Sequence, residues 1–358
     1  MPDVLLFGAT GYTGRLTAQA LAARGASFTV AGRDRTKLEE LAADTGAAGV
    51  AVAEVGDVPA LSTAAAEVRV LLSCVGPFTS LGRTATDAAL AAKVNYLDST
   101  GEGEFIAELI ERCEAPAQAA HIAMAPAMGF DEVPGDVAAA LAIEGFGICD
   151  LVLTYAVTVT PSRGTIRSAV GIVSTPARWI EGGRFRNVRA GEQERWAPLP
   201  PPIGPSRSIS FPLAEAYLAP RHIDLRSLKV FMVANRGARL GVRIADGALR
   251  AAASAGIRTL VDAALARGRG GPGETDRAGH AWTILAEATS NGRRRAVAMA
   301  GRDLYGLTAE LLATGAMEMA RPDYEPTGVL APVQAVPVES WRRELARHAV
   351  SIEIFESG

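Results

Sequence analysis

The 358-residue chain has few cysteines and no long apolar run. Its three cysteines, Cys74, Cys113 and Cys149, are too few and too scattered for a disulfide framework or a cluster of thiolate metal ligands. Such cysteine usage is typical of a reducing compartment. No apolar run is long enough for a membrane span, and the first apolar run lacks the basic segment that precedes it in a secretory signal. We therefore expect a cytoplasmic protein.

Other absences exclude whole classes of function. Lys and Arg total 36 against 39 Asp and Glu, a net charge of −3, so the basic surplus of a nucleic-acid-binding protein is missing. The histidines show no His-x-x-x-His spacing and the cysteines form no Cys-x-x-Cys pair, so we expect no metal. The chain also lacks the Gly-x-Ser-x-Gly elbow of hydrolases and the Tyr-x-x-x-Lys pair of short-chain dehydrogenases.

Short apolar runs alternate with helical stripes over roughly the first 130 residues, beginning with Val4–Phe7. This alternation, with short loops, predicts a doubly wound parallel sheet. From about residue 150 the predicted strands are longer and rich in β-branched residues, and Ser290-Asn291-Gly292 predicts a tight hairpin. The predicted fold class is α/β, with a nucleotide-binding domain over 1–148, an α+β domain with a mixed sheet over 149–302, and C-terminal helices over 303–358.

Three glycines spaced three apart, Gly8, Gly11 and Gly14, lie between the first apolar run and a helical stripe. Amides at the start of a helix have no intrahelical partner, and the helix dipole adds partial positive charge there. A pyrophosphate satisfies both, and glycines let the backbone approach its oxygens without intervening side chains. The segment therefore predicts a dinucleotide site; a turn that binds no ligand is the alternative.

The end of the second predicted strand bears on which dinucleotide binds. An NAD site has an acidic residue there for the adenosine ribose, whereas this chain has Arg33, followed by Arg35 and Lys37. A guanidinium suits a 2′-phosphate, so we favour NADP(H) over NAD(H). Two alternatives stay open: these cations only begin a solvated helix, or Asp34 turns toward the ribose instead.

Further candidates follow the fourth predicted strand, because ligands of such sheets bind beyond the carboxyl ends of the strands. In the loop 74–77, Gly76 permits close approach to a cofactor and Pro77 stiffens the backbone. Cys74 has no basic residue near it in sequence, so we interpret it as a small residue beside the cofactor rather than as a nucleophile.

Carboxylates at the ends of later strands are candidates for acid–base chemistry. Asp98 and Glu102 lie in "YLDSTGEGEF" after the fifth predicted strand, and Asp131 lies in "MGFDEVPGD" after the sixth. Each is placed to relay a proton or to orient a polar group. Each is equally well placed to cap a helix or to lie in its first turn, so both roles stay open.

Five segments occur in order across the first 140 residues: "GATGYTGR", "AGRDRTKL", "SCVGPF", "NYLDSTGE" and "MGFDEVPGD". Together they resemble the saccharopine dehydrogenase-like oxidoreductases, a group that includes the trans-acting enoyl reductases of actinobacterial lipid synthesis. The resemblance implies an N-terminal Rossmann domain that binds NADP(H), a second domain on the substrate side, and C-terminal segments that pack back on the first domain. The implied cofactor contacts are Gly8, Thr10, Gly11, Tyr12, Thr13, Gly14, Arg33, Cys74, Val75 and Gly76.

The leading functional hypothesis is an NADPH-dependent reductase of an activated double bond in a small-molecule substrate. An enoyl C=C bond of a lipid or polyketide-type substrate is one candidate, and a C=N bond of an amino-acid-type substrate is the other. Arg163 and Arg167 are candidates for an anion site that would hold a carboxylate or a phosphate. A protein that binds NADP(H) without turnover, as a sensor or scaffold, is the alternative of another class. A homodimer is compatible with the sequence, which does not decide it.

Overall fold

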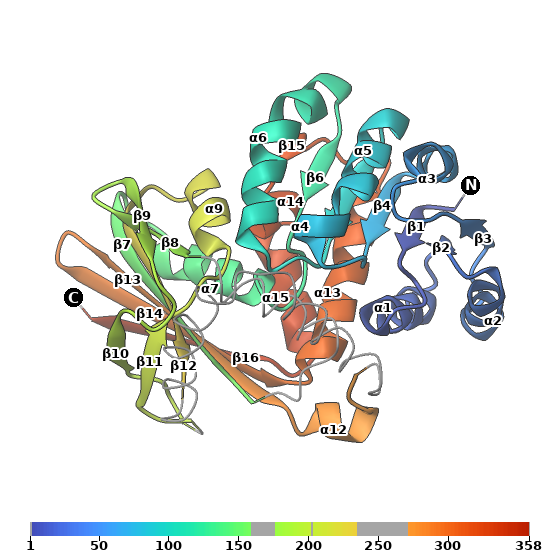
Figure 1. Cartoon of the computed structure of the whole chain (residues 1–358). Helices are drawn as coiled ribbons and strands as arrows, with labels where there is room; N and C mark the ends of the chain where they lie inside the picture. Colours follow the sequence, from blue (N-terminus) through green and yellow to red (C-terminus); the bar gives the residue numbers. More distant parts are fainter. Residues whose placement is uncertain (1, 159–175, 202, 235–270, 358) are drawn as a thin grey trace, which may run out of the picture. The chain divides into compact units, whose positions relative to one another are not determined.

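The computed structural model describes residues 2–158, 176–201, 203–234 and 271–357 (Figure 1). Two stretches with sequence predictions lie outside these residues: the segment with Arg163 and Arg167, and residues from about 241 to 267, whose Ala- and Arg-rich sequence predicts a helix. The chain divides into two units, of which the first comprises 1–133 and 305–344 and the second 134–304 and 345–358. No helix among the described residues is both long and apolar enough to cross a membrane.

A seven-stranded, all-parallel sheet forms the centre of the first unit, in the order β15-β6-β5-β4-β1-β2-β3. Its strands are β1 (Val4–Phe7), β2 (Phe28–Gly32), β3 (Gly49–Val52), β4 (Val70–Ser73), β5 (Asn95–Asp98), β6 (Ala123–Ala125) and β15 (Gly328–Val329). The helices are α1 (Tyr12–Ala23), α2 (Arg35–Thr45), α3 (Val58–Ala65), α4 (Phe78–Leu81), α5 (Arg83–Ala92), α6 (Gly103–Ala120), α13 (Leu304–Met319), α14 (Pro332–Ala335) and α15 (Val338–Arg347). The predicted doubly wound parallel sheet is confirmed.

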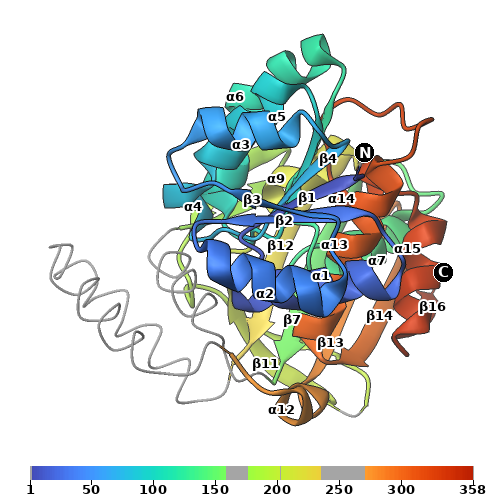
Figure 2. The ribbon, with the colours of Figure 1, turned by 90° about the vertical axis from the view of Figure 1, so that its right-hand side faces the viewer.

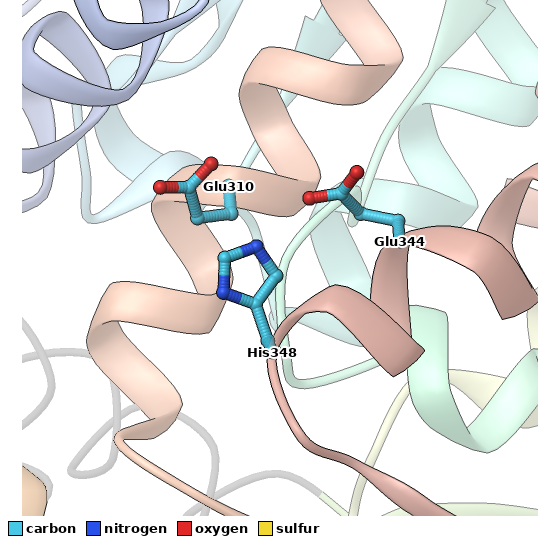
Figure 3. Close-up of side chains that lie close together, drawn as sticks. All are labelled: Glu310, Glu344 and His348. Atoms are coloured by element: carbon cyan, nitrogen blue, oxygen red, sulfur yellow. The ribbon is translucent and has the colours of Figure 1, made fainter.

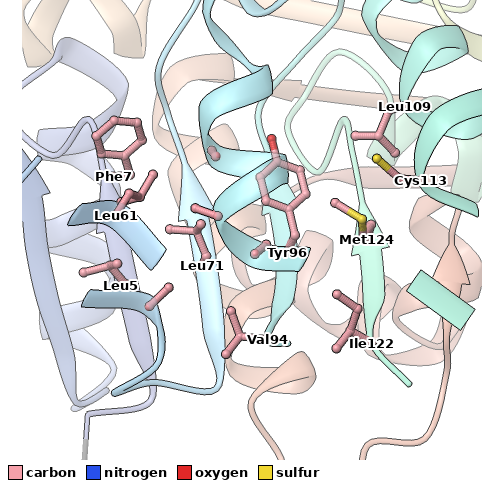
Figure 4. Close-up of a cluster of buried hydrophobic side chains, with 14 of the residues drawn as sticks. Leu5, Phe7, Leu61, Leu71, Val94, Tyr96, Leu109, Cys113, Ile122 and Met124 are labelled. Atoms are coloured by element: carbon pink, nitrogen blue, oxygen red, sulfur yellow. The ribbon is translucent and has the colours of Figure 1, made fainter. Parts of the chain in front are cut away.

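Helices cover both faces of this sheet: α3 to α6 lie on one face, and α1, α2 and α13 on the other (Figures 1 and 2). The α3–α6 face packs on side chains that alternate along the strands, such as Leu5, Phe7 and Tyr96 (Figure 4). On the opposite face, α13 packs so closely on the sheet that a Cβ on Gly315 would lie 3.2 Å from Leu97 Cδ1, which explains the glycine at this position. The C-terminal helix α13 therefore packs on the first sheet, as expected, whereas residues 345–358 belong to the second unit.

A mixed nine-stranded sheet forms the second unit, with the path β10-β11-β12-β7-β13-β14-β16 and with β8 and β9 attached at β12. Its strands are β7 (Cys149–Val157), β8 (Ala177–Glu181), β9 (Arg184–Val188), β10 (Glu194–Ala197), β11 (Ser206–Ser210), β12 (Leu225–Val233), β13 (Ala281–Ser290), β14 (Arg293–Arg302) and β16 (Ser351–Ser357). The helical segments are α7 (Val133–Ile143), α9 (Glu215–Leu218), η1 (Ala219–Arg221) and α12 (Glu274–Ala278). The β12–β7 pair is parallel, whereas the β13–β7 pair is antiparallel.

The predicted hairpin of the second unit is confirmed. Strands β13 and β14 pair over ten residues each, and the two residues that join them have positive φ, 48° at Asn291 and 82° at Gly292. Two successive residues of that kind make the turn whose twist suits adjacent antiparallel strands. Helix α7 packs closely on the sheet of this unit, because a Cβ on Gly135 would clash with the hydroxyl of Tyr155. The mixed sheet agrees with the predicted fold class.

Candidate nucleotide-binding site

Close packing explains two of the three glycines in the loop after β1. Gly8 has φ of +81°, and a Cβ on it would lie 2.6 Å from Val75 Cγ2. A Cβ on Gly14 would lie 2.2 Å from the carbonyl oxygen of Gly8 and 2.8 Å from Cα of Ala9. The first glycine therefore lets the β1 and β4 loops approach, and the third lets α1 start directly against the loop.

The N-terminus of α1 has the features that a phosphate requires. Its N-cap is Gly11, in an extended conformation, and no side chain of the described residues caps the helix. The nearby polar groups bond elsewhere, since Arg15 Nε donates to the carbonyl of Thr10 at 3.1 Å and Thr17 Oγ1 to that of Thr13 at 2.9 Å. Amides of the first turn are thus available to an anion at the carboxyl edge of the sheet, where the helix dipole also favours one.

At the end of β2, the structure distinguishes the charged residues that the sequence left equivalent. Asp34 is the N-cap of α2, and its carboxylate accepts from the backbone N of Lys37 at 3.2 Å and from its Nζ at 2.6 Å. The side-chain hydrogen bond from Lys37 lowers the pKa of Asp34. Arg35 pairs with Glu39 at 3.6 Å. Arg33 is exposed and has no hydrogen bond or ion pair within the described part of the chain, so its guanidinium is the cation available for a ligand.

The loop after β4 lies beside the glycine loop. Cys74 N donates to the carbonyl of Phe7 at 2.9 Å, and Cys74 Sγ lies 4.0 Å from Thr17 Oγ1 of α1. Burial raises the pKa of the Cys74 thiol to about 12, so it stays protonated at neutral pH and is a poor nucleophile. The Gly76–Pro77 peptide bond is cis, and Pro77 is the N-cap of α4.

Glu102 binds this same loop. Its side chain is 5% exposed, and Oε1 accepts from Phe78 N at 2.9 Å. Oε2 accepts from Thr79 N at 2.9 Å and from Thr79 Oγ1 at 2.8 Å. The carboxylate thus caps α4 rather than its own helix α6. Neither of the two roles that the sequence suggests for Glu102, acid–base chemistry or a place in the first turn of its own helix, includes this contact.

Asp98 joins the ends of β5 and β6. Oδ1 accepts from Thr100 N at 2.8 Å and from Ala127 N at 3.0 Å, and Oδ2 accepts from Tyr96 OH at 2.7 Å. Burial raises the pKa of Asp98 to about 6, whereas these three donors oppose the shift. Three donors on a fully buried carboxylate leave it little access to a substrate.

Asp131 differs from both of these acids. It is exposed, and within the described residues its carboxylate has no hydrogen-bond or ion-pair partner. A Cβ on Gly101 would lie 3.1 Å from Asp131 Oδ2, so the "TGE" and "GFD" segments meet at this point. A residue of α13 holds the turn that carries Asp131: Phe130 N donates a hydrogen bond to Thr308 Oγ1 at 3.2 Å.

Side chains of α13 complete this edge, and sequence reasoning did not identify them. The ring of Tyr305 packs edge-on against Tyr12 of the glycine loop, with centroids 5.2 Å apart. At the other end of α1, Arg24 donates from Nη2 to Glu310 Oε2 of α13 at 2.6 Å and also pairs with Glu344 of α15. Figure 3 shows the side chains of Glu310 and Glu344 close together. The family resemblance implies only that C-terminal segments pack back on the first domain, and not which residues make the contacts.

Known proteins resemble the part of the chain that contains these residues. Residues 4–126 match the saccharopine dehydrogenase NADP binding domain. The whole chain superposes on a saccharopine dehydrogenase (L-Glu forming) from Saccharomyces cerevisiae with a TM-score of 0.68, covering 100% of both chains at 13% identity. A mutant of meso-dapdh from Clostridium tetani E88 superposes over 97% of this chain and 99% of its own, with a TM-score of 0.51 and 12% identity. At these identities, the superpositions establish the fold alone.

Curated relatives match by sequence over the N-terminal part. A trans-acting enoyl reductase of Mycobacterium leprae is 33% identical over 141 residues, and one of Mycobacterium ulcerans is 34% identical over 144. A lipid droplet localized protein of Caenorhabditis elegans is 29% identical over 147 residues. Each match covers 38% of this chain and 34% of the relative. Residues 4–126, within the first unit, are therefore similar to the saccharopine dehydrogenase NADP binding domain.

Proposed function

We propose that the protein is an NADPH-dependent reductase of an activated double bond, with an enoyl C=C bond as the leading candidate. The observation that carries the proposal is the start of α1 beside Gly8, Gly11 and Gly14, which no described side chain caps, together with Arg33 at the end of β2, which has no hydrogen bond or ion pair among the described residues. The amides fit a pyrophosphate and the guanidinium fits the 2′-phosphate that distinguishes NADPH from NADH. When bound, NADPH supplies the hydride.

Reduction of a double bond also requires a proton, and we propose Asp131 as its donor. Asp98 and Glu102 are buried and occupied by amide donors, whereas Asp131 is exposed beside Gly101 at the same edge of the sheet. An accessible carboxyl at a ligand-binding edge suits proton delivery. Asp131→Asn keeps the shape and removes the proton, so we expect turnover to fall at least about a hundredfold while the Kd for NADPH stays unchanged. An unchanged turnover would assign the proton to another group.

The enoyl substrate is favoured by the partial sequence match to trans-acting enoyl reductases. The alternative is an imine substrate, for which the overall fold shared with a saccharopine dehydrogenase is the motivating observation. Both need the same cofactor geometry, so the substrate must be decided by assay. Consumption of NADPH with an enoyl thioester supports the first, and consumption only with a keto acid plus an amine supports the second. Binding without consumption across both panels supports a sensor or scaffold.

The cofactor itself is tested by the fluorescence of the reduced nicotinamide on titration with NADPH and with NADH. We expect Arg33→Ala to raise the Kd for NADPH by about tenfold or more, as loss of a charge-assisted hydrogen bond predicts, and to leave the Kd for NADH unchanged. Arg35→Ala is the matched comparison, because Arg35 is a neighbouring exposed cation that pairs with Glu39; its effect should be smaller. Absence of NADPH binding by the unmodified protein would remove the proposed function.

A further inference from the structure

A buried acidic side chain fixes the loop that follows β4. The carboxylate of Glu102 takes up three donors from two successive residues, Phe78 and Thr79, all within 2.9 Å. These donors belong to the first turn of α4, where backbone amides lack intrahelical partners. Because Glu102 is 5% exposed, water cannot readily replace it as the acceptor.

Glu102 is itself held by the rest of the carboxyl edge. Its backbone N donates to Thr100 Oγ1 at 3.0 Å, and Thr100 N donates to Asp98 Oδ1 at 2.8 Å. Asp98 Oδ1 also accepts from Ala127 N at 3.0 Å, beyond the end of β6. A continuous set of hydrogen bonds therefore links the loops that follow β4, β5 and β6.

The loop held in this way lies on one side of the glycine loop. In the sheet order, β2 lies on one side of β1, and β4, β5 and β6 lie on the other. A dinucleotide with its pyrophosphate at α1 and its 2′-phosphate at Arg33 has its adenosine half beyond β2. Its nicotinamide half must then extend toward the β4 loop, where Val75 Cγ2 would lie 2.6 Å from a Cβ on Gly8.

We infer that Glu102 is a positioning residue that orders the loop 76–79 for the nicotinamide half of the dinucleotide. The inference rests on the proposed function and assigns to Glu102 no contact with the substrate. It separates two halves of one site: Arg33 acts on the adenosine half, and Glu102 acts, through Phe78 and Thr79, on the other half.

The test compares NADPH with adenosine 2′,5′-bisphosphate, which contains only the adenosine half with its 2′-phosphate. Glu102→Gln replaces one acceptor oxygen by an amide group that faces a backbone N–H. We expect its Kd for NADPH to rise about tenfold or more, whereas its Kd for adenosine 2′,5′-bisphosphate stays within about twofold of the unmodified protein. Glu104→Gln is the matched control: the same chemical change two residues on, at an exposed position in the first turn of α6, should leave both values unchanged.

The outcomes separate this inference from the proposed function. Equal weakening of both ligands, or no weakening of either, overturns the positioning role of Glu102. An unmodified protein that binds neither ligand overturns the proposed function instead. If Glu102→Gln does not fold, Thr79→Val carries the test, because it removes one hydroxyl donor from Oε2 without burying an unpaired charge. The same selective loss for NADPH is expected there, with recovery in Thr79→Ser, which keeps the hydroxyl.

Discussion

Replacement of Gly14 by alanine tests whether α1 packs against the β1 loop as closely as the nucleotide site requires. A Cβ at position 14 would lie 2.2 Å from the Gly8 carbonyl oxygen and 2.8 Å from the Ala9 Cα, both of which are backbone atoms. Backbone cannot rotate away as the end of a side chain can, so α1 or the loop must move. Overpacking of this kind costs typically about 1–3 kcal/mol, and occasionally more. The gain in helix propensity from glycine to alanine is only about 1 kcal/mol.

With a clash as short as this one, we expect Gly14→Ala to lower the free energy of unfolding by about 2 kcal/mol in total, or about 4–8 °C in Tm for a domain of this size. The Kd for NADPH should rise at least about tenfold, because the displaced atom belongs to Gly8. Gly147→Ala is the control, since nothing lies within 4 Å of the added Cβ there. Differential scanning calorimetry and nucleotide fluorescence measure the two effects. A Gly14→Ala variant with unchanged Tm and unchanged Kd would refute the packing argument.

Two further changes test the groups that hold the first unit together. Arg24→Ala removes the guanidinium that pairs with the 2%-exposed Glu344, so we expect the free energy of unfolding, measured with denaturant, to fall by about 1.5–3 kcal/mol. Arg342→Ala, at an exposed ion pair of the same helix as Glu344, should cost less than about 1 kcal/mol, and equal losses would contradict the argument. Because the pKa of Asp98 is raised to about 6, protonation stabilises the folded state fully below about pH 4, and about 3 kcal/mol of that stabilisation is lost as the pH rises to about 6. Asp98→Asn should flatten this part of the stability–pH curve, and an unchanged slope would refute the assignment.

The alternation of strands and helices in the first unit could be predicted because its parallel strands are buried on both faces. A continuous apolar run directly before a helical stripe, such as Val4–Phe7, is typical of a strand in such a sheet. Helix ends followed equally local rules, as where Gly46 ends α2 with φ of +69°. The sequence did not reveal α4, since its four residues are too few for a periodic pattern and its cap, Glu102, comes from 23 residues or more away.

Strands of the second unit were harder to predict because pairing, and not composition, makes several of them strands. Residues Arg184–Val188 of β9 are mostly exposed, and two of the five are charged. They are extended because each pairs with a residue of β8. Strand β16 likewise adds to β14 from the far end of the chain. Such non-local pairing leaves little periodic signal in either segment. By contrast, the β13–β14 hairpin could be predicted, since its turn depends on two adjacent residues.

In the candidate site, too, features that depend on local interactions could be predicted from the sequence, and features that depend on distant residues could not. That Asp34 caps its helix follows from a hydrogen bond three residues away, and this contact leaves Arg33 as the available cation. The roles of Asp98 and Glu102 depend on donors from Ala127, Phe78 and Thr79, which no local pattern connects to them. The sequence could therefore predict that the three acids lie at one edge of the sheet, but not which of them hold the loops and which is free of such donors.

A carboxylate buried at a ligand-binding edge must be compensated, since an unpaired buried charge is strongly destabilising. Backbone amides at strand and helix ends are the nearest donors, and an acid that takes them fixes the loops and loses its access to substrate. Asp98 and Glu102 have done so, with three donors each. The acid that can still exchange a proton is the one whose carboxylate holds no such donors among the described residues. Asp131, beside Gly101, meets that condition, and desolvation raises its pKa to about 6. The burial and the hydrogen-bond donors of the three acids thus determine which of them hold loops in place and which is proposed to deliver a proton.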